Sequence, residues 1–261
     1  MLERMQVYRC ERCGAGVVIL RGADGHLNCC GAAMTLHQST AIEPEEFLTP
    51  PPMEHNLSMP VKTVLRMIQT RHAEHTWYFG VKAVKNPIDA WVYQEIIHEI
   101  RPDIIIEIGN AYGGGTLHLA HLLDLLGHGK VIGVDLQHQT IAPGIERHPR
   151  ITFITGDACE SILRVKALIA PGDTVLVIED SAHTYANTLN VLRTYSPLVT
   201  PGSYLIVEDS HCHHGVDTGP SPGPYEAIET FLRENDCFKS DRARENFFIT
   251  FNPKGYLKRI R

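Results

Sequence analysis

Four short apolar runs, each carrying an acidic residue near its end, constrain the fold of this chain more than any other feature. The runs are DIIIEIG (103–109), KVIGVDL (130–136), TVLVIED (174–180) and SYLIVED (203–209). None alternates strictly between apolar and polar residues, so each predicts a strand that is buried on both faces. Segments with helical spacing separate the runs, which predicts a parallel sheet with helices on both faces. Ligands of such sheets bind at the carboxyl ends of the strands.

Further segments complete this predicted α/β body. ITFITGDA (151–158) predicts another parallel strand, and CFKSD (237–241) and FFITFN (247–252) predict two last strands. Helical spacing of apolar residues predicts helices over 61–75, 87–100, 115–126, 159–169, 185–199 and 224–235. We therefore expect a Rossmann-like domain over residues 61–261, preceded by a proline-rich, acidic linker over residues 41–60.

Composition narrows the classes of partner. The formal net charge is −6 and the isoelectric point is about 6.2, which provides no general field for nucleic acid or an anionic membrane. No run reaches the roughly 18 apolar residues of a membrane span, and the first residues carry no apolar signal core. We expect a cytoplasmic protein that binds neither nucleic acid nor membrane.

Four of the seven cysteines fall close together near the start of the chain, at Cys10, Cys13, Cys29 and Cys30. Four thiolates make a tetrahedral site for iron or zinc, and the spacing favours a metal site in a reducing compartment over disulfides. VVIL (17–20) and HLNC (26–29) predict two strands of a hairpin that brings the cysteine pairs together. We expect residues 1–40 to form a small β-rich module that needs its metal to fold, either structural, redox-active or a dimer contact.

A glycine-rich turn follows the first predicted strand of the body. Gly109, Gly113 and Gly114 permit a tight turn and a close approach of a ligand to the backbone. Glu107 lies at the same strand end. A dinucleotide would lay its pyrophosphate over this loop, where a carboxylate repels it, whereas the ammonium of S-adenosylmethionine is attracted to an acid.

Two further acids extend this argument. Asp135 ends the second strand, where it is placed to accept hydrogen bonds from ribose hydroxyls, and Asp157 follows the third strand, where adenine is commonly held. A nicotinamide cofactor would also use the acid after the second strand. The glycine pattern is weak evidence alone, and with the three acids it favours S-adenosylmethionine over NAD.

The fourth and fifth strands both end in Glu-Asp-Ser, and they deliver Asp180, Glu208 and Asp209 to one edge of the sheet. Three neighbouring carboxylates cannot all stay ionised without a cation, and all-oxygen ligands suit Mg²⁺. His183 follows Asp180 by three residues and is a candidate general base. The alternatives are helix capping or solvated strand ends for the acids, and an N-cap or surface position for the histidine.

Other polar residues stay unassigned at this level. Glu179 stands where an apolar residue is more usual at a strand end. The histidine-rich loop HCHHGVDTGPSPG (211–223), with His211 to His214, is either a second, softer metal site or a polar lid. Lys82 and Lys85 either contact an acidic substrate or are solvated.

Motifs over about residues 77–259 resemble the cephalosporin hydroxylase and rhamnosyl O-methyltransferase group, with macrolide sugar O-methyltransferases as relatives. The segments that carry the resemblance include PDIIIEIGNAYGGGT, DSAHT, YSPLVTPGSYLIVEDS and GPYEAIETFL. It implies an S-adenosylmethionine-binding, magnesium-dependent enzyme. The family's metal ligands fall on Asp180, Glu208 and Asp209, its base falls on His183, and its cofactor contacts fall on Glu107, Gly109, Asp135 and Asp157.

Residues 7–36 resemble desulforedoxin and the N-terminal module of desulfoferrodoxin, on the strength of VYRCERCG and the CCG triplet. That resemblance implies an iron centre on the four cysteines. The chemistry of four thiolates also admits zinc.

Three functional hypotheses result. The first is a magnesium-dependent O-methyltransferase that acts on a hydroxyl of a sugar or other secondary metabolite, as a homo-oligomer with a small-molecule substrate. The second is a hydroxylase or redox-linked enzyme that uses the cysteine centre for electron transfer, although a tetrathiolate iron has no open position for oxygen. The third is a non-catalytic protein that binds S-adenosylmethionine or senses metal.

Overall fold

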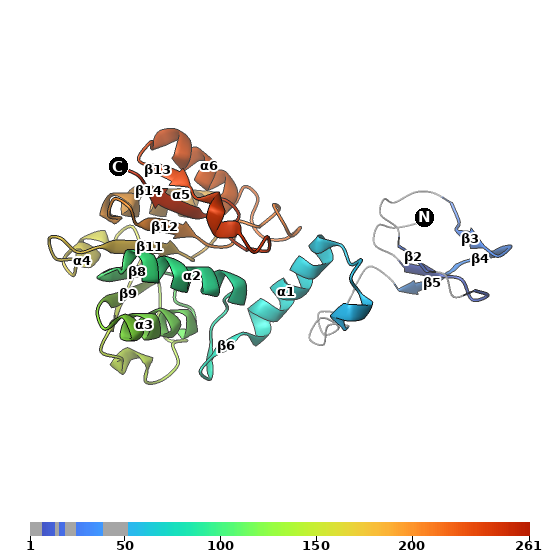
Figure 1. Ribbon diagram of the computed structural model, residues 1–261, viewed down its shortest axis with the longest axis horizontal. Coiled ribbons are helices and arrows are strands. Elements are labelled where there is room, and N and C mark those ends of the chain that lie inside the picture. Colours follow the sequence, from blue (N-terminus) through green and yellow to red (C-terminus); the bar gives the residue numbers. More distant parts are fainter. Residues whose placement is uncertain (1–6, 14–15, 19–24, 39–51) are drawn as a thin grey trace. The chain divides into compact units, whose positions relative to one another are not determined.

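The computed structural model describes residues 7–13, 16–18, 25–38 and 52–261 (Figure 1). The chain divides into two compact units, Met1–Leu57 and Ser58–Arg261, and each is described by itself. Within the described residues, no helix combines the length and the apolar character needed to span a bilayer.

Short strands make up the described part of the first unit. The strands β1 (Val7–Arg9), β2 (Gly16–Val18) and β5 (Thr35–Gln38) form an antiparallel sheet in the order β2-β1-β5. A second pair consists of β3 (Asn28–Cys29) and β4 (Ala32–Ala33). A short 3₁₀ helix, η2, covers Met53–His55.

In its described part, the expected hairpin between residues 17–20 and 26–29 is wrong in its pairing, since β2 pairs with β1 and β3 pairs with β4, while residues 19–24 lie outside the described residues. The reason lies in two residues with left-handed backbones, Cys30 (φ 55°) and Gly31 (φ 73°). Two consecutive positive φ angles make the two-residue turn that matches strand twist. The chain therefore folds back directly after Cys29, and β3 meets the residues that follow it.

A seven-stranded sheet forms the centre of the second unit. Its order is β10 (Ile151–Thr155), β9 (Lys130–Asp135), β8 (Ile104–Ile108), β11 (Val175–Glu179), β12 (Tyr204–Val207), β14 (Tyr256–Arg259) and β13 (Phe238–Ser240). The first five strands are parallel, and β14 runs antiparallel to both of its neighbours. Every residue of β8 and β11 is buried, as expected for central strands covered on both faces. The predicted α/β class is confirmed.

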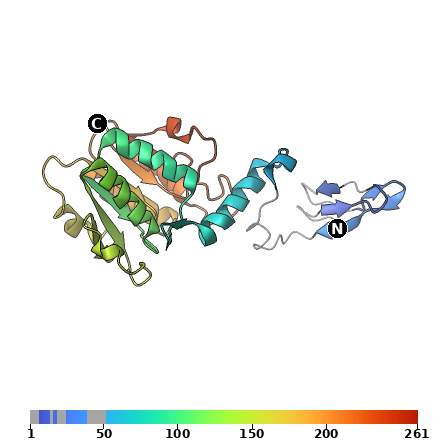
Figure 2. The same ribbon diagram turned by 60° about the horizontal axis from the view of Figure 1, so that its bottom comes forward.

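Helices cover both faces of this sheet (Figures 1 and 2). Helices α2 (Pro87–Ile100) and α3 (Gly114–Leu126) contribute to one apolar core, and α4 (Ile162–Lys166), α5 (Tyr185–Tyr195) and α6 (Pro224–Glu234) contribute to the other. Helix α1 (Val61–His75) lies beside the sheet in both views. A small hairpin of β6 (Trp77–Tyr78) and β7 (Val81–Lys82) leads from α1 to α2.

The strand predicted over residues 247–252 is wrong, because the last strand is β14. Phe248 has a left-handed backbone (φ 67°), which interrupts an extended run. The buried carboxylate of Asp89 then accepts hydrogen bonds from the Phe251 amide (2.9 Å) and the Thr250 hydroxyl (2.5 Å). This segment therefore bonds to the start of α2 instead of to a neighbouring strand.

The sheet order reverses between β8 and β11, which makes that junction the switch point of the fold. The Asp180 amide donates to the Ile108 carbonyl (2.8 Å), and the Glu208 amide donates to the Glu179 carbonyl (2.9 Å). These bonds continue the register past the strand ends. The acids that follow β11 and β12 are therefore delivered side by side next to the glycine-rich turn after β8.

Candidate functional site

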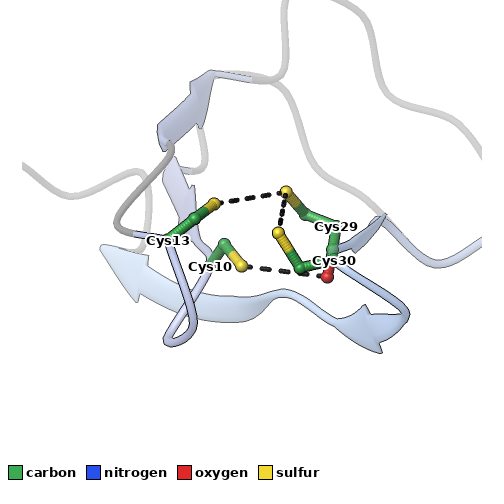
Figure 3. Close-up of side chains that lie close together, drawn as sticks. All are labelled: Cys10, Cys13, Cys29 and Cys30. Atoms are coloured by element: carbon green, nitrogen blue, oxygen red, sulfur yellow. Dashed lines mark hydrogen bonds between the residues drawn. The ribbon is translucent and has the colours of Figure 1, made fainter.

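The four cysteines of the first unit converge on one point (Figure 3). Their sulfur atoms all lie within 4.8 Å of one another. The Sγ atoms of Cys13 and Cys29 are 3.6 Å apart, and those of Cys29 and Cys30 are 3.8 Å apart. A tetrahedron with metal–sulfur bonds of about 2.3 Å has edges of about 3.8 Å. The cysteine geometry therefore fits a tetrathiolate metal.

Crowding of the thiols supports the same conclusion. The pKa of the Cys29 thiol is raised to about 12, and its hydrogen bond with Cys13 makes the largest contribution to that rise. Without a cation, four thiols this close resist ionising together, whereas a metal ion holds them as thiolates. Zinc and iron both accept this donor set.

The second unit has a cavity of about 170 Å³ at the switch point between β8 and β11. Its lining includes Glu107, Gly109 and Asn110 from the end of β8, together with acids and a histidine that follow β11 and β12. Candidates from both sequence arguments, Glu107 and Gly109 on one hand and Asp180, His183 and Asp209 on the other, therefore line one cavity.

The glycines of the turn are required first by the packing of the protein itself. A side chain on Gly109 (φ 89°) would place its Cβ 2.0 Å from the Asp180 carbonyl oxygen, and one on Gly114 would place it 2.4 Å from the Lys82 carbonyl oxygen. Gly113 has a left-handed backbone (φ 86°) and caps α3. The turn thus packs closely against the residue after β11 and against the end of β7. From the sequence, the small size of these glycines had been attributed to the close approach of a ligand.

Glu107 is buried and held in a network. Its Oε2 accepts hydrogen bonds from the Thr116 hydroxyl (2.5 Å) and the Asn110 amide (2.9 Å), and its Oε1 faces the ammonium of Lys85 at 3.6 Å. Burial raises the pKa of Glu107, and Lys85, Thr116 and Asn110 oppose that shift. Glu107 lines the cavity, and a ligand ammonium there would share its Oε1 with Lys85.

Asp135 and Asp157 lie at the ends of β9 and β10, as predicted. Asp135 Oδ2 accepts hydrogen bonds from the backbone amides of Asn110 (2.8 Å) and Ala111 (3.3 Å), so this carboxylate also fixes the glycine-rich turn. Asp157 is exposed and accepts a hydrogen bond from the Glu160 amide (3.0 Å). Their contacts to ribose and adenine stay predictions.

The cavity is lined by a cluster of three side chains whose possible ligand atoms lie within 4.8 Å of one another: Asp180, His183 and Asp209. The His183 Nε2 atom lies 3.7 Å from Asp180 Oδ1 and 3.5 Å from Asp209 Oδ2. Both His183 (φ 53°) and Asp209 (φ 55°) have left-handed backbones, which non-glycine residues adopt mostly where the surroundings impose it. The fold therefore directs these three side chains toward one another.

Glu208 lies on the other side of Asp180, and Lys85 stands between them. The Lys85 Nζ atom is 2.5 Å from Asp180 Oδ2 and 2.6 Å from Glu208 Oε1. The sequence left two roles open for Lys85, contact with an acidic substrate or exposure to solvent. The structure supports neither role, because the ammonium is paired with carboxylates of the protein itself. Its burial alone would lower its pKa, but the carboxylates of Asp180, Glu208 and Glu107 hold that pKa well above the ordinary value.

Glu179 is also buried, and its Oε1 accepts hydrogen bonds from the hydroxyl of Ser181 (2.5 Å) and the side-chain amide of Asn187 (3.2 Å). It therefore ties the end of β11 to the start of α5. A carboxylate with these two partners explains why a polar residue stands at this strand end.

The histidines of the 211–223 loop have separate partners. His211 is buried, stacks on Phe251 and contacts Gln69 Oε1 through Nε2 (2.7 Å). His213 contacts the Gly219 carbonyl (3.0 Å), and His214 contacts Glu226 (2.7 Å). Within the described residues these rings form no joint metal-binding group, which leaves the loop without support as a second metal site.

The donor set fits a divalent cation of the hard class. Asp180 and Asp209 present oxygen atoms toward one space, and Mg²⁺ is bound in proteins through one or two carboxylates together with waters and substrate oxygens. Glu208 is the adjacent carboxylate, and its Oε1 is paired with the Lys85 ammonium at 2.6 Å.

Comparisons with known proteins agree with this architecture. Residues 70–260 match the family described as rhamnosyl O-methyltransferase/CmcI, and residues 2–37 match the desulfoferrodoxin N-terminal domain. A rhamnosyl O-methyltransferase of Mycobacterium tuberculosis is 38% identical over 194 residues, covering 70% of this chain and 78% of that protein. The protein of the same name from Mycobacterium leprae is 37% identical over 205 residues, covering 71% and 88%.

Solved structures extend the comparison to the fold. An apo CmcI structure is 25% identical with a TM-score of 0.56, covering 71% of this chain and 76% of that one. A CmcI structure with Mg and S-adenosylmethionine is 24% identical with a TM-score of 0.58, covering 71% and 77%. A desulfoferrodoxin of Syntrophotalea carbinolica is 42% identical over 43 residues, which span 16% of this chain and 34% of that protein.

Both resemblances inferred from the sequence are therefore confirmed. The match over residues 70–260 takes in the whole sheet and the cavity at its switch point. The chain belongs to the rhamnosyl O-methyltransferase/CmcI family, and it is an S-adenosylmethionine-dependent methyltransferase that carries a desulfoferrodoxin-like cysteine module.

Proposed function

We propose that this protein is a magnesium-dependent O-methyltransferase that acts on a hydroxyl group of a sugar. The observation that carries the proposal is the convergence of Asp180, His183 and Asp209 within 4.8 Å, in the same cavity as the glycine-rich turn. A carboxylate pair next to an imidazole provides a cation site and a base for one hydroxyl.

Different residues of the cavity have different roles in the proposed methyl transfer. Glu107 Oε1, which lies 3.6 Å from the Lys85 ammonium, provides negative charge that Lys85 and the cofactor's ammonium share at one end of the cavity. Asp180, Asp209 and Glu208 would hold the metal, which supplies positive charge that favours ionisation of the acceptor hydroxyl. His183 Nε2 takes the proton that this hydroxyl loses as its oxygen displaces S-adenosylhomocysteine from the methyl carbon. The left-handed backbone of His183 fixes that nitrogen between the two carboxylates.

The names of two relatives support the proposed acceptor class. The two mycobacterial relatives carry the name rhamnosyl O-methyltransferase and share 37–38% identity with this chain. A deoxysugar with neighbouring hydroxyls offers two oxygens to one cation. Rhamnosides are therefore the first acceptors to test.

The cysteine module is proposed as a structural iron or zinc centre in a reducing compartment such as the cytoplasm. Its four thiolates occupy all four tetrahedral positions, which leaves none for oxygen or substrate. This arrangement favours methyl transfer over hydroxylation as the chemistry of the protein.

The test is a screen for S-adenosylhomocysteine formation by the full chain. Rhamnosides and other hydroxylated glycosides are supplied with S-adenosylmethionine, with and without added Mg²⁺. We expect turnover with a rhamnoside that requires Mg²⁺. Calorimetry with S-adenosylmethionine checks the cofactor site independently of the acceptor, and absence of binding there would refute the proposed chemistry.

A further inference from the structure

A lysine lies where a metal-binding acid cluster would be expected to hold only carboxylates. The Lys85 Nζ atom lies 2.5 Å from Asp180, 2.6 Å from Glu208 and 3.6 Å from Glu107. The lysine side chain is only 13% exposed. Three acids from three neighbouring strand ends therefore share one buried ammonium.

The backbone around Lys85 is fixed on both sides. Val84 before it has a left-handed backbone (φ 46°), and the Lys85 amide donates to the Thr76 hydroxyl (3.3 Å). Asn86 after it caps α2, with its side chain accepting from the Ile88 amide (3.2 Å). These constraints on both flanks hold the Lys85 Cα in one place at the start of α2.

The first turn of α3 leaves room for the lysine chain. A side chain on Gly115 would place its Cβ 2.6 Å from Lys85 Cε and 2.9 Å from Glu107 Oε1. Gly115 is helical with no positive φ, so its backbone conformation does not require glycine. The glycine is needed for space, and the space is filled by Lys85.

We propose that Lys85 is an internal cation that competes with Mg²⁺ for Asp180 and Glu208, and that this competition sets the metal affinity of the site. The inference rests on the proposed metal site and adds a regulatory residue to it. Asp180 and Glu208 cannot give the same oxygens to an ammonium and to Mg²⁺, and two cations within a few ångströms repel each other in a buried cavity.

The competition also has a defined alternative position for the lysine. Glu107 Oε1 already lies 3.6 Å from the ammonium and accepts no hydrogen bond from Thr116 or Asn110, which both bond to Oε2. When Mg²⁺ takes Asp180 and Glu208, Lys85 keeps Glu107 as its counter-ion. The lysine therefore moves within the cavity and stays paired.

Calorimetric titration of Mg²⁺ into the full chain tests the inference through Lys85→Met. Mg²⁺ reports on the carboxylate site alone, because four thiolates prefer softer cations. Removal of the competing ammonium is expected to tighten Mg²⁺ binding about tenfold or more, since a tenfold change in affinity requires only a small part of a buried charge interaction. The matched control is Lys82→Met, since Lys82 lies three residues away over the Tyr112 ring (4.9 Å). The control removes the same charge from the same loop and should leave the Mg²⁺ affinity unchanged.

Each outcome decides the inference. Equal or weaker Mg²⁺ binding by Lys85→Met would overturn it while leaving the metal site intact. No Mg²⁺ binding by any of the proteins would overturn the proposed metal dependence and the inference together. If metal-free Lys85→Met does not fold, the competition predicts that Mg²⁺ restores its circular dichroism and thermal transition. Failure of Mg²⁺ to do so would overturn the inference.

Discussion

The two candidate metal sites of this protein differ in what surrounds them. The thiolate site joins strands of two to four residues in a small unit, and it lies on a tight turn and strand ends. The carboxylate site lies at the ends of long-range paired strands whose side chains are fully buried. We therefore expect the cation to organise the chain in the first unit, whereas in the second the sheet organises the ligands.

The internal charges differ in the same way. The described part of the first unit brings four thiols within 4.8 Å of one another, and Arg12 donates a hydrogen bond to the Cys30 carbonyl oxygen beside them (3.0 Å). The second unit places the ammonium of Lys85 among its acids. A site that carries its own cation can keep its fold when the metal is absent. The comparison thus predicts that metal removal unfolds the first unit and leaves the second folded.

Loss of one thiolate should have the largest effect. Cys13→Ser removes one of four metal ligands, and structural zinc stabilises comparably small modules by about 10–16 kcal/mol. Hydrogen exchange followed by mass spectrometry should show loss of protection over β1, β2 and β5 with no change in the large sheet. Cys237→Ser, which changes a thiol of the second unit outside the cluster, is the control. Retained protection in the Cys13 variant would show that the first unit folds without its metal.

Loss of the proposed base should abolish function without affecting either unit's fold. His183→Ala is expected to lower the turnover number by about 10²–10⁴-fold, which is the usual contribution of a general base. Binding of S-adenosylmethionine, measured by calorimetry, should be retained. His213→Ala changes a histidine that contacts the Gly219 carbonyl (3.0 Å) and does not line the cavity, and it should keep full turnover. Equal turnover by the two variants would contradict the assignment of His183.

A buried acid away from any metal tests whether the sheet unit depends on its own polar network. Asp89 accepts hydrogen bonds from Asn86, Thr250, the Phe251 amide and Tyr256. Asp89→Asn loses acceptors for part of this set, and we expect a loss of about 2–4 kcal/mol in the free energy of unfolding. Asp236→Asn, at an exposed ion pair with Arg261, should cause no measurable loss in denaturant unfolding.

The pH dependence of Asp89 has a definite sign. Burial raises the pKa of Asp89 from its ordinary value to about 6. The folded state therefore binds the Asp89 proton more tightly than the unfolded chain does. The contribution of this proton to the free energy of unfolding is fully present below the ordinary pKa and is lost as pH rises through about 6. The stability difference between wild type and Asp89→Asn should shrink over this window. A difference that grows with pH would contradict the raised pKa.

The smallest expected effect concerns the helix that follows the carboxylate site. The Thr184 hydroxyl caps α5 by accepting from the Asn187 amide (3.3 Å). Thr184→Ala should cost about 1 kcal/mol, and Thr184→Ser should restore most of it. Because the cap belongs to the fold, the loss should be equal with and without Mg²⁺. A loss that appears only with Mg²⁺ would mean that the metal, and not the sheet, organises this loop.

The sequence predicts the central sheet well and its periphery less well. Strands such as β8 and β11 are continuous buried apolar runs, and their pattern admits few other structures. The segment 247–252 has the same apolar character, but Asp89, more than 150 residues earlier in the sequence, takes its hydrogen bonds. The pairing of β3 was not predicted because the turn at Cys30 and Gly31 needs two positive φ angles. A Cys-Gly pair does not by itself indicate such a turn.

The acids and His183 were located from the strand ends, because the carboxyl ends of neighbouring parallel strands always meet. Lys85 was not located, since its partners Asp180 and Glu208 lie 95 and 123 residues away in the sequence. A buried lysine looks like any surface lysine in a sequence. One feature of the sequence does point to Lys85: it directly precedes the Asn-Pro pair that begins α2, and this helix start fixes the lysine backbone at the sheet edge.

Anomalous diffraction from Mn²⁺ is the most direct test of the difference between the two sites. Mn²⁺ shares the oxygen preference of Mg²⁺ and is visible by its anomalous signal. Crystals of the full chain grown with S-adenosylhomocysteine and Mn²⁺ should show one manganese peak within about 2.5 Å of carboxylate oxygens of Asp180 and Asp209. Lys85 should have moved from Asp180 toward Glu107, and the cysteine centre should keep its own metal. A manganese peak elsewhere, or none while Lys85 still bonds to Asp180, would contradict the account.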